Sequence, residues 1–422
     1  MKKSLFAIAA VTAFAGAAQA QSSVTVYGIL DVGYVGGNLR VAPGGSTAVA
    51  AATGNGFTGG AQSTNRLGFR GTEDLGGGLS AFFTIEQAIT PNGDSAFSNS
   101  GNMNRQTFAG LKKNGLGDAA IGTQYTPVHT AVAATDAGQT NNIMGNVIYP
   151  ISTAPTSVTA AGTVTNANNL DTNSSYTVRA RNALTLNTDT FAGFKARAIL
   201  VGNNNNTNQT AATTTNVSGG INNQNGWGLG LDYTWNKLFV TANYQALTSK
   251  NPWNTTAVAS LNTSTGATAT AAGTTGAASI WGVGGSNIAG SNVQDNQTYV
   301  AGTYDFGILK AYAQWVNRKA TSQIDATRYV SRSAQQIGVR SVITPKVEAW
   351  ASAGNGKYTA FGASNPSASF TGYQVGANYL LSKRTNLYAI YGQSQTSNVA
   401  ISTTGFTSTN ANNYALGLRH TF

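Results

Sequence analysis

The sequence predicts an all-β fold, a closed antiparallel barrel of sixteen strands that crosses a membrane. Short segments throughout the chain alternate apolar residues with small or polar ones, which is the period of a β-strand. Charged residues make up only 9% of the chain, against about 25% in ordinary soluble domains. Beyond the N-terminal segment, no uncharged apolar run reaches the roughly 20 residues of a membrane-spanning helix. A barrel therefore fits the composition better than a helical membrane protein.

The first twenty residues are expected to be a secretory signal peptide. Met1, Lys2 and Lys3 form a basic start, residues 4–18 are apolar and uncharged, and Ala18-Gln19-Ala20 is a small-x-small cleavage site. The order of these three parts makes a buried helix of the mature fold the weaker interpretation. We therefore expect a mature barrel over residues 21–422.

Period-two alternation predicts the strands one by one. The candidate strands are 23–34, 63–72, 78–88, 104–112, 118–125, 174–187, 191–201, 227–236, 238–248, 297–306, 308–319, 334–344, 346–354, 370–381, 385–395 and 412–422. The connections alternate between tight turns and long loops, and the long ones are 35–62, 89–103, 126–173, 202–226, 249–296, 320–333, 355–369 and 396–411. Outer-membrane barrels have short periplasmic turns and long extracellular loops, so both chain ends should lie on the periplasmic side.

Two strands show the expected lipid-facing side. In 227–236, an apolar face begins at Trp227 and ends at Trp235, while Asp232 lies on the opposite face. The two tryptophans are about 20 Å apart along the membrane normal, which suits two aromatic girdles. In 412–422, the lipid face is expected to carry four residues, Tyr414, Leu416, Leu418 and Phe422. For one strand alone, these aromatic residues could equally pack the core of a soluble protein. Sixteen strands that all have a polar opposite face do not fit that alternative.

Charges within the strands predict a basic lumen. Eleven basic residues are placed inward, namely Arg66, Arg70, Arg105, Arg179, Arg181, Lys195, Arg197, Lys310, Arg318, Arg340 and Arg419. Five acidic residues oppose them, namely Asp31, Glu86, Asp232, Asp305 and Glu348. Each Arg or Lys would cost about 2–4 kcal/mol at mid-membrane on a lipid face. A hydrated lumen with this excess should enrich anions, although any one arginine is as readily explained by an ion pair that stiffens the wall.

Catalysis and cofactor binding have little support in the sequence. Outer-membrane barrel enzymes pair a histidine with Ser or Asp near the extracellular rim, and a catalytic base needs a partner within hydrogen-bond reach. His420 is expected near the opposite end of the barrel, and His129 has no acidic residue nearby in sequence. Cysteine is absent, so thiolate metal sites and disulfides are not expected. The sequence pI near 9.7 does not predict nucleic-acid binding, because the basic residues alternate within strands instead of forming a patch. We expect no enzyme, no cofactor and no nucleic-acid partner.

Several segments resemble one known family over the whole length of the chain. They are Ser23-Val-Thr-Val-Tyr-Gly-Ile-Leu-Asp31, Asn65-Arg-Leu-Gly-Phe-Arg-Gly-Thr-Glu-Asp-Leu-Gly76, Arg105-Gln-Thr-Phe-Ala-Gly-Leu111, Ile121-Gly-Thr-Gln-Tyr-Thr-Pro127, Phe191-Ala-Gly-Phe194 and Gly417-Leu-Arg-His-Thr-Phe422. Together they resemble the trimeric general diffusion porins of Gram-negative outer membranes, especially the β-proteobacterial type.

The resemblance implies a constriction loop at about 126–173 that folds into the lumen of the barrel. It further implies a basic cluster of Arg66, Arg105 and Arg179 facing that loop, with Arg70 and Arg181 close by. The full set of expected pore-lining residues is Arg66, Arg70, Arg105, Arg179, Arg181, Lys195, Arg197, Thr123 and Glu86. Thr123 stands where relatives commonly have arginine, and the loop is nearly free of charge.

The resemblance also implies a location and partners. The expected location is the outer membrane, the expected assembly a homotrimer, and the expected surroundings are outer-membrane lipid and lipopolysaccharide. The strand of Tyr414, Leu416, Leu418 and Phe422 would be the signal read by the barrel assembly machinery. Small anions and hydrophilic solutes would diffuse passively through the channel. An adhesin or receptor barrel is the alternative, although loops such as 249–296 carry few of the charged and aromatic residues that anchor recognition.

Overall fold

The computed structural model describes residues 23–42, 50–93, 104–150, 175–213, 216–250, 293–323, 326, 329–360, 367–397 and 408–422. The strands of the first half are β1 (Ser23–Ala42), β2 (Ala50–Gly59), β3 (Arg66–Gly76), β4 (Leu79–Ala88), β5 (Asn104–Lys113), β6 (Gly117–Tyr125), β7 (Arg179–Thr188), β8 (Phe194–Thr213) and β9 (Asn216–Trp235). The second half contains β10 (Leu238–Lys250), β11 (Val293–Asp305), β12 (Lys310–Ser322), β13 (Tyr329–Thr344), β14 (Val347–Ala360), β15 (Ser367–Leu380), β16 (Thr385–Thr396) and β17 (Ser408–Thr421). One helix, α2 (Pro127–Thr135), follows β6.

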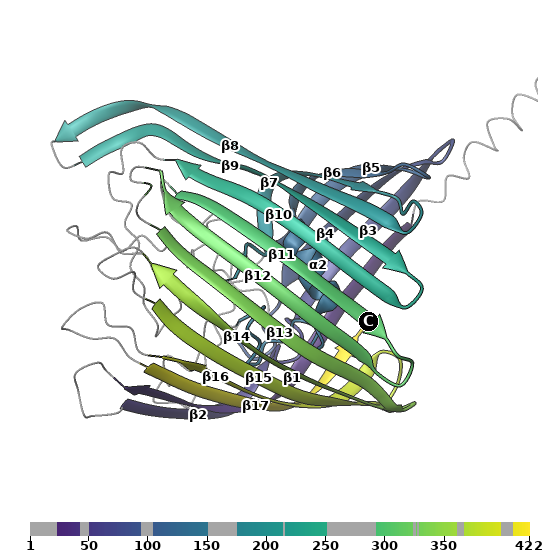
Figure 1. Cartoon of the computed structure of the whole chain (residues 1–422). Helices are drawn as coiled ribbons and strands as arrows, with labels where there is room; N and C mark the ends of the chain where they lie inside the picture. The colour runs from purple at the N-terminus through teal and green to yellow at the C-terminus, as the bar shows by residue number, and fades with distance from the viewer. Residues whose placement is uncertain are drawn as a thin grey trace, which may run out of the picture.

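All strand pairs are antiparallel, and the sheet closes where β1 pairs with β17 (Figure 1). β1 pairs with β3 through Ser23–Ile29 and with β2 through Val32–Val41. β2 and β3 therefore share one position around the wall. The seventeen assigned strands fill sixteen positions, so the prediction of a closed sixteen-stranded antiparallel barrel is confirmed.

The alternation of side chains sets the two faces of the wall. In β9, the apolar residues of the predicted lipid face are exposed, and Trp227 and Trp235 are 45% and 61% accessible. Asp232, on the opposite face, is buried beside Arg197. The exposed aromatic residues near the strand ends, such as Trp235, Tyr304 and Tyr379, are placed as interfacial girdles require.

Two predicted long loops contain strand instead. β1 and β2 occupy much of 35–62, and β8 and β9 continue as a paired hairpin through most of 202–226. Figure 1 shows β8 and β9 projecting beyond their neighbours. These extensions are rich in Asn, Thr and Gly on both faces, so they give no apolar alternation to detect. Backbone pairing with the neighbouring strand specifies them.

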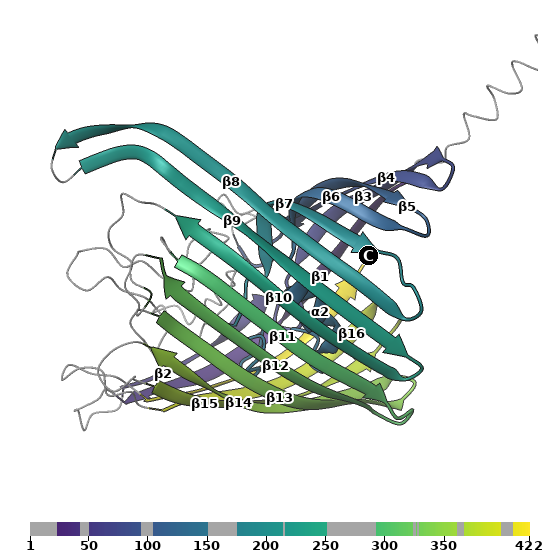
Figure 2. The same ribbon diagram turned by 45° about the horizontal axis from the view of Figure 1, so that its top comes forward.

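The segment from α2 to residue 150 lies inside the barrel, against inward-facing residues of the wall (Figure 2). Thr126 caps the helix by accepting a hydrogen bond from the His129 amide, and Pro127 occupies its first turn. Val128, Ala131 and Val132 are buried with wall residues such as Tyr299 and Val316. Within the described residues, no helix has both the length and the apolar character of a membrane span.

Gly28 and Phe422 complete the seam between the two chain ends. The amide of each residue donates to the carbonyl of the other at 3.2 Å. A Cβ atom at Gly28 would lie 2.3 Å from the Phe422 ring, so glycine is needed for this close approach. Tyr414, Leu416, Leu418 and Phe422 are 38%, 57%, 36% and 39% exposed, which agrees with the predicted lipid face. The predicted signal peptide, Met1–Ala20, lies outside the described residues.

Candidate pore constriction

Three arginines and one glutamate meet on the inner wall formed by β3, β4, β5 and β7. Glu86 on β4 accepts a hydrogen bond from Arg105 Nε at 2.6 Å and lies 3.8 Å from Arg66 Nη1. The guanidinium of Arg179 lies 5.5 Å from the ring centre of Tyr125, and Arg105 Nη2 donates to the Tyr125 hydroxyl at 2.9 Å. The structure therefore brings together the three arginines that the sequence places at the constriction.

β-Bulges shape this cluster. β4 and β5 pair with an irregularity at this point: Glu86 lies opposite Gln106, but the next residue, Gln87, lies opposite Asn104. Arg105 of β5 is therefore a bulged residue that has no partner on β4. Strict alternation would have put Arg105 on the face of Leu111, which is 52% exposed to the outside. A bulge re-aims a side chain in this way, and Arg105 is consequently buried on the inside. A second bulge on β7, marked by Asn182 at φ 50°, lies beside Arg179.

Aromatic residues from the loop lie next to the arginines. The His129 ring of α2 is 4.5 Å from that of Tyr125 and 6.0 Å from those of Tyr149 and Tyr176. His129 belongs to the loop and not to a spanning strand, and burial together with Arg179 and Arg105 lowers its pKa well below the usual range. The imidazole is therefore neutral at pH 7 and adds no charge to the cluster, while its Nδ1 lies 3.2 Å from the Tyr176 hydroxyl.

Towards the periplasmic turns, the lumen is hollow along β1 and β3–β7. This hollow has a volume of about 450 Å³, and its lining includes Arg70, Lys112 and Asp118. Arg70 is exposed, with its guanidinium 5.4 Å from the ring centre of Tyr27. Tyr27 in turn donates a hydrogen bond to Glu86, which links this wall to the arginine cluster. Lys112 was missed in the sequence because it lies close to a turn.

Other inward basic residues form ion pairs instead of lining an open surface. Arg197 on β8 pairs with Asp232, and Arg340 on β13 pairs with Glu348. Lys195 lies opposite Asp232 in the register and is half-buried. Arg318 pairs with Asp295 at 2.5 Å, both fully buried. Asp295 was missed because it precedes the alternating part of its strand. These pairs leave fewer unpaired basic residues on the inner wall than the sequence count of eleven gives.

For Thr123 and Arg181, a position at the constriction stays a prediction. Thr123 is buried and lies opposite Thr107 of β5. Thr107 is exposed and shares the outer face of β5 with Ala109 and Leu111. Directly opposed residues share a face, so the register does not support a pore-lining position for Thr123. Arg181 is half-buried beside the β7 bulge.

The far wall of the barrel holds the loop through backbone hydrogen bonds. Gln374 donates to the carbonyls of Ile143 and Met144, and Asn413 accepts from the Met144 amide at 2.8 Å. Asp136, a loop residue, accepts from the Thr140 amide and from Asn146 and Gln336. Burial raises the Asp136 pKa, while these hydrogen bonds act in the opposite direction. The contacts hold residues 136–149 against β13–β17.

Arg332 on β13 is the strongest single anchor of the loop and was missed in the sequence. Its side chain donates to the Val147 carbonyl at 2.6 Å, to the Ser175 hydroxyl at 2.5 Å and to the Tyr358 hydroxyl at 3.1 Å. The guanidinium also lies 4.4 Å from the ring centre of Phe370. It therefore joins both described ends of the loop to the wall. The intervening residues of the expected constriction loop, 151–173, lie outside the described part of the chain.

We expect Arg332→Met to raise single-channel conductance and its noise. The variant keeps much of the side-chain volume but leaves the Val147 carbonyl without its donor, a loss of about 1–3 kcal/mol for a buried group. Arg384→Met, in the exposed turn between β15 and β16, is the matched control. Planar-bilayer recordings check the effect, and equal traces from both variants would contradict the anchoring role.

A sequence model of the family described as "Gram-negative porin" matches residues 7–399. The chain belongs to this family. The membership confirms the predicted family and its outer-membrane location. It also confirms that the protein is not an enzyme, because porins form channels.

Individual relatives match over shorter segments. The "Outer membrane porin protein 32" of Delftia acidovorans is 41% identical over 142 residues, which cover 32% of this chain and 35% of that protein. The "Major outer membrane protein P.IB" of Neisseria meningitidis serogroup B is 39% identical over 122 residues, or 29% of this chain and 33% of that protein. The chain thus spans about a third of the length of these relatives in the aligned regions.

Solved structures share the fold over nearly the whole chain. An "Anion-selective porin from Comamonas acidovorans" has a TM-score of 0.61 at 20% identity, covering 95% of this chain and 100% of its own. A trimer form of OmpT from Vibrio cholerae has a TM-score of 0.54 at 15% identity, covering 95% and 99%. At these identities the likeness supports the barrel fold alone.

Proposed function

We propose that the protein is a water-filled channel for the passive diffusion of ions and small hydrophilic solutes, with a weak-to-moderate preference for anions. The arginine cluster is the observation that carries the proposal. Arg66 and Arg105 flank one carboxylate, Glu86, on the inner wall, and Arg179 lies close to both arginines. Arg66 is partly exposed, while Arg105 and Arg179 are buried beside aromatic residues of the loop. A confined passage lined by one sign of charge raises the local concentration of the opposite ion.

The size of the preference follows from the charge that remains after pairing. Three arginines against one glutamate leave the cluster with a net charge of 3 − 1 = +2. A monovalent anion at about 4 Å from one unit charge in water gains about 1 kcal/mol, and an effective dielectric constant near 20 would raise this about fourfold. Salt at physiological strength screens the attraction beyond about 8 Å. The preference should therefore be real but salt-dependent, and weaker than the full basic count of the chain would give.

The proposal includes the expected constriction loop, 126–173, the signal peptide, 1–20, and a homotrimer. Anchoring of residues 136–149 on the far wall supports the constriction, because it narrows the lumen towards the arginine side. The homotrimer rests on the family resemblance, and OmpT from Vibrio cholerae is a relative in fold with a trimer form. Contacts with lipopolysaccharide and with the barrel assembly machinery likewise belong to the proposal.

Reversal potentials across a salt gradient test the anion preference. For the wild-type channel in a planar bilayer at neutral pH, we expect a potential whose sign shows anions to be the more permeant ions. The potential should shrink as the salt concentration on both sides rises, because screening weakens the attraction. A potential of the opposite sign would overturn the proposed selectivity. Absence of stable conductance would instead favour the adhesin interpretation, in which loops plug the barrel.

A further inference from the structure

The lumenal hollow of about 450 Å³ near the periplasmic turns combines basic, aromatic and hydroxyl-bearing side chains. Those contributed by β3, β4 and β5 include Arg70, Phe82, Thr84, Phe108 and Lys112. Thr84 lies two residues from Glu86 along β4 and therefore shares its inward face. Register partners extend this row to Arg70 on one side and to Phe108 on the other. The hollow therefore opens to the lumen on the periplasmic side of the arginine cluster.

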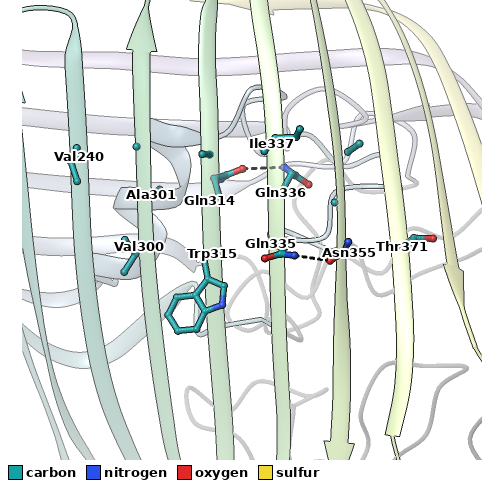
Figure 3. A pocket seen from close by; sticks show the side chains of 14 residues that line it. Val240, Val300, Ala301, Gln314, Trp315, Gln335, Gln336, Ile337, Asn355 and Thr371 are labelled. Carbon is teal, nitrogen blue, oxygen red and sulfur yellow. Dashed lines mark hydrogen bonds between the residues drawn. The ribbon is translucent and has the colours of Figure 1, made fainter.

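A different hollow, of about 760 Å³, lies in the outer wall across β10–β15 (Figure 3). Val240, Val300 and Ile337 line it and are exposed on the outward face of their strands. In a membrane-spanning barrel this outer surface faces lipid, whereas the inner face of the wall meets water. A water-soluble ligand can therefore reach the lumenal hollow but not the outer one.

Phe82 and Phe108 form an aromatic surface in the lumenal hollow. Their ring centres are 6.2 Å apart with an interplanar angle of 77°, which is an edge-to-face pair. A Cβ atom at Gly110 would lie 2.7 Å from Phe82 Cζ, so this ring rests on the strand at a position that requires glycine. Inward aromatic residues beneath the loop, such as Tyr299 and Trp350, are buried, whereas both phenylalanines are half-buried. The pair therefore leaves aromatic surface on which a third ring can pack.

Two basic side chains, Arg70 and Lys112, lie beside the aromatic pair. Each occupies a diagonal position next to Phe82 on an adjoining strand, with Cα atoms about 7–8 Å apart. Both side chains are exposed, and neither makes an ion pair within the described part of the chain. The Arg70 guanidinium lies 5.4 Å from the ring centre of Tyr27, a cation–π contact that holds it at the wall and leaves its N–H groups for an anion. Thr84, which lies opposite Arg70, adds a hydroxyl donor.

The acidic groups near the hollow are held by other donors. Asp118 of β6, which lines the hollow, accepts a hydrogen bond from Asn187 at 2.7 Å. Asp74, close to the periplasmic end of β3, accepts one from an amide of its own turn at 2.9 Å. The residues that line the hollow carry two positive charges and one negative charge, so their net charge is 2 − 1 = +1. A solute with one negative charge therefore complements the hollow.

We propose that this hollow is a binding site for aromatic carboxylates that pass through the channel. The ring of the solute packs against Phe82 and Phe108, while Arg70 and Thr84 donate hydrogen bonds to its carboxylate. An aliphatic carboxylate can use the same donors but not the aromatic packing, so the site favours the aromatic acid. The inference rests on the proposed function, because the solute must enter a water-filled lumen, but it does not depend on the ion preference of the constriction.

Reduction of the chloride current by benzoate in planar bilayers tests this site, with cyclohexanecarboxylate as the comparison acid. Both acids carry one negative charge and a six-membered ring, but cyclohexanecarboxylate is not aromatic. For the wild type, we expect benzoate to reach its half-maximal effect at a concentration about threefold or more below that of cyclohexanecarboxylate. Arg70→Gln should weaken the effect of both acids, whereas Arg384→Gln, in an exposed turn, should not. Each current is expressed relative to that of the same variant without acid.

A second pair of variants tests the aromatic surface. Phe82→Leu with Phe108→Leu keeps apolar side chains in the hollow but removes both rings, and should abolish the difference between the two acids. The matched control, Phe191→Leu with Phe306→Leu, changes two exposed aromatic residues of the periplasmic turns and should keep that difference. Heat-resistant mobility in gel electrophoresis confirms that every variant folds.

Equilibrium dialysis of labelled benzoate against the folded full-length protein compares the same variants without conduction. A protein that binds benzoate through Arg70 but conducts no chloride would defeat the proposed function and leave this site standing. A protein that conducts chloride but responds equally to benzoate and cyclohexanecarboxylate would overturn the site and leave the proposed function standing. Equal benzoate affinity of the Arg70→Gln and Arg384→Gln variants would likewise overturn the site.

Discussion

Replacing Arg66 and Arg179 by glutamine is expected to abolish most of the anion preference of the channel. The substitutions reduce the net charge of the cluster from +2 to 0, while the pair of Arg105 and Glu86 is kept. Each guanidinium is worth about 1 kcal/mol to an anion at about 4 Å in water, and salt screens part of this, so removing both charges should bring the anion-to-cation permeability ratio close to unity. Reversal potentials under a salt gradient measure this ratio directly.

The control for this pair removes the same total charge elsewhere. Lys383→Gln with Arg384→Gln takes two positive charges from the exposed turn between β15 and β16, far along the chain from the cluster. If both double variants change the reversal potential equally, the selectivity comes from the overall charge of the protein and not from the constriction. Glu86→Gln should act in the opposite direction by raising the net charge to +3, at a cost in assembly because Arg105 loses its partner.

The barrel was predictable because lipid imposes a simple rule on every strand. One face must be apolar, and strands such as β9 and β17 show that face directly in the sequence. Beyond the bilayer the rule no longer applies, and the Asn-rich extensions of β8 and β9 were accordingly interpreted as loop. Their pairing depends on the neighbouring strand, which local alternation does not report.

The constriction was predictable in composition but not in detail. Arg105 faces inward because of a bulge, whereas strict alternation would place it beside Leu111 on the outer face. Asp295 and Arg332 were missed because they fall in segments predicted as loops, 249–296 and 320–333, whereas the structure places them on β11 and β13. Their partners, Arg318 and Val147, are 23 and 185 residues away. Such pairing depends on where the loop rests inside the barrel, and one sequence contains no local signal for it.

Phe422 has a larger expected effect on assembly than on conduction. The residue exchanges two backbone hydrogen bonds with Gly28 and covers it with the aromatic ring, so it completes the seam between β1 and β17. Deleting it removes both hydrogen bonds, each worth about 0.5–1.5 kcal/mol, and an interfacial aromatic residue. An unpaired strand edge at the seam also exposes backbone groups that lipid cannot satisfy.

We therefore expect deletion of Phe422 to lower the yield of heat-resistant barrel by about tenfold, since about 1.4 kcal/mol corresponds to a factor of ten in an equilibrium. The molecules that do assemble should conduct as the wild type does, because the Phe422 side chain lies on the outer face of the wall, whereas the Arg66 side chain of the neighbouring strand points inward to Glu86. Phe306→Ala is the matched control, since it removes an exposed aromatic residue from the β11–β12 turn without touching the seam. Gel mobility measures the yield, and bilayer recordings measure the conductance. A deletion variant that assembles normally but conducts differently would show that Phe422 acts on the pore and not on closure of the barrel.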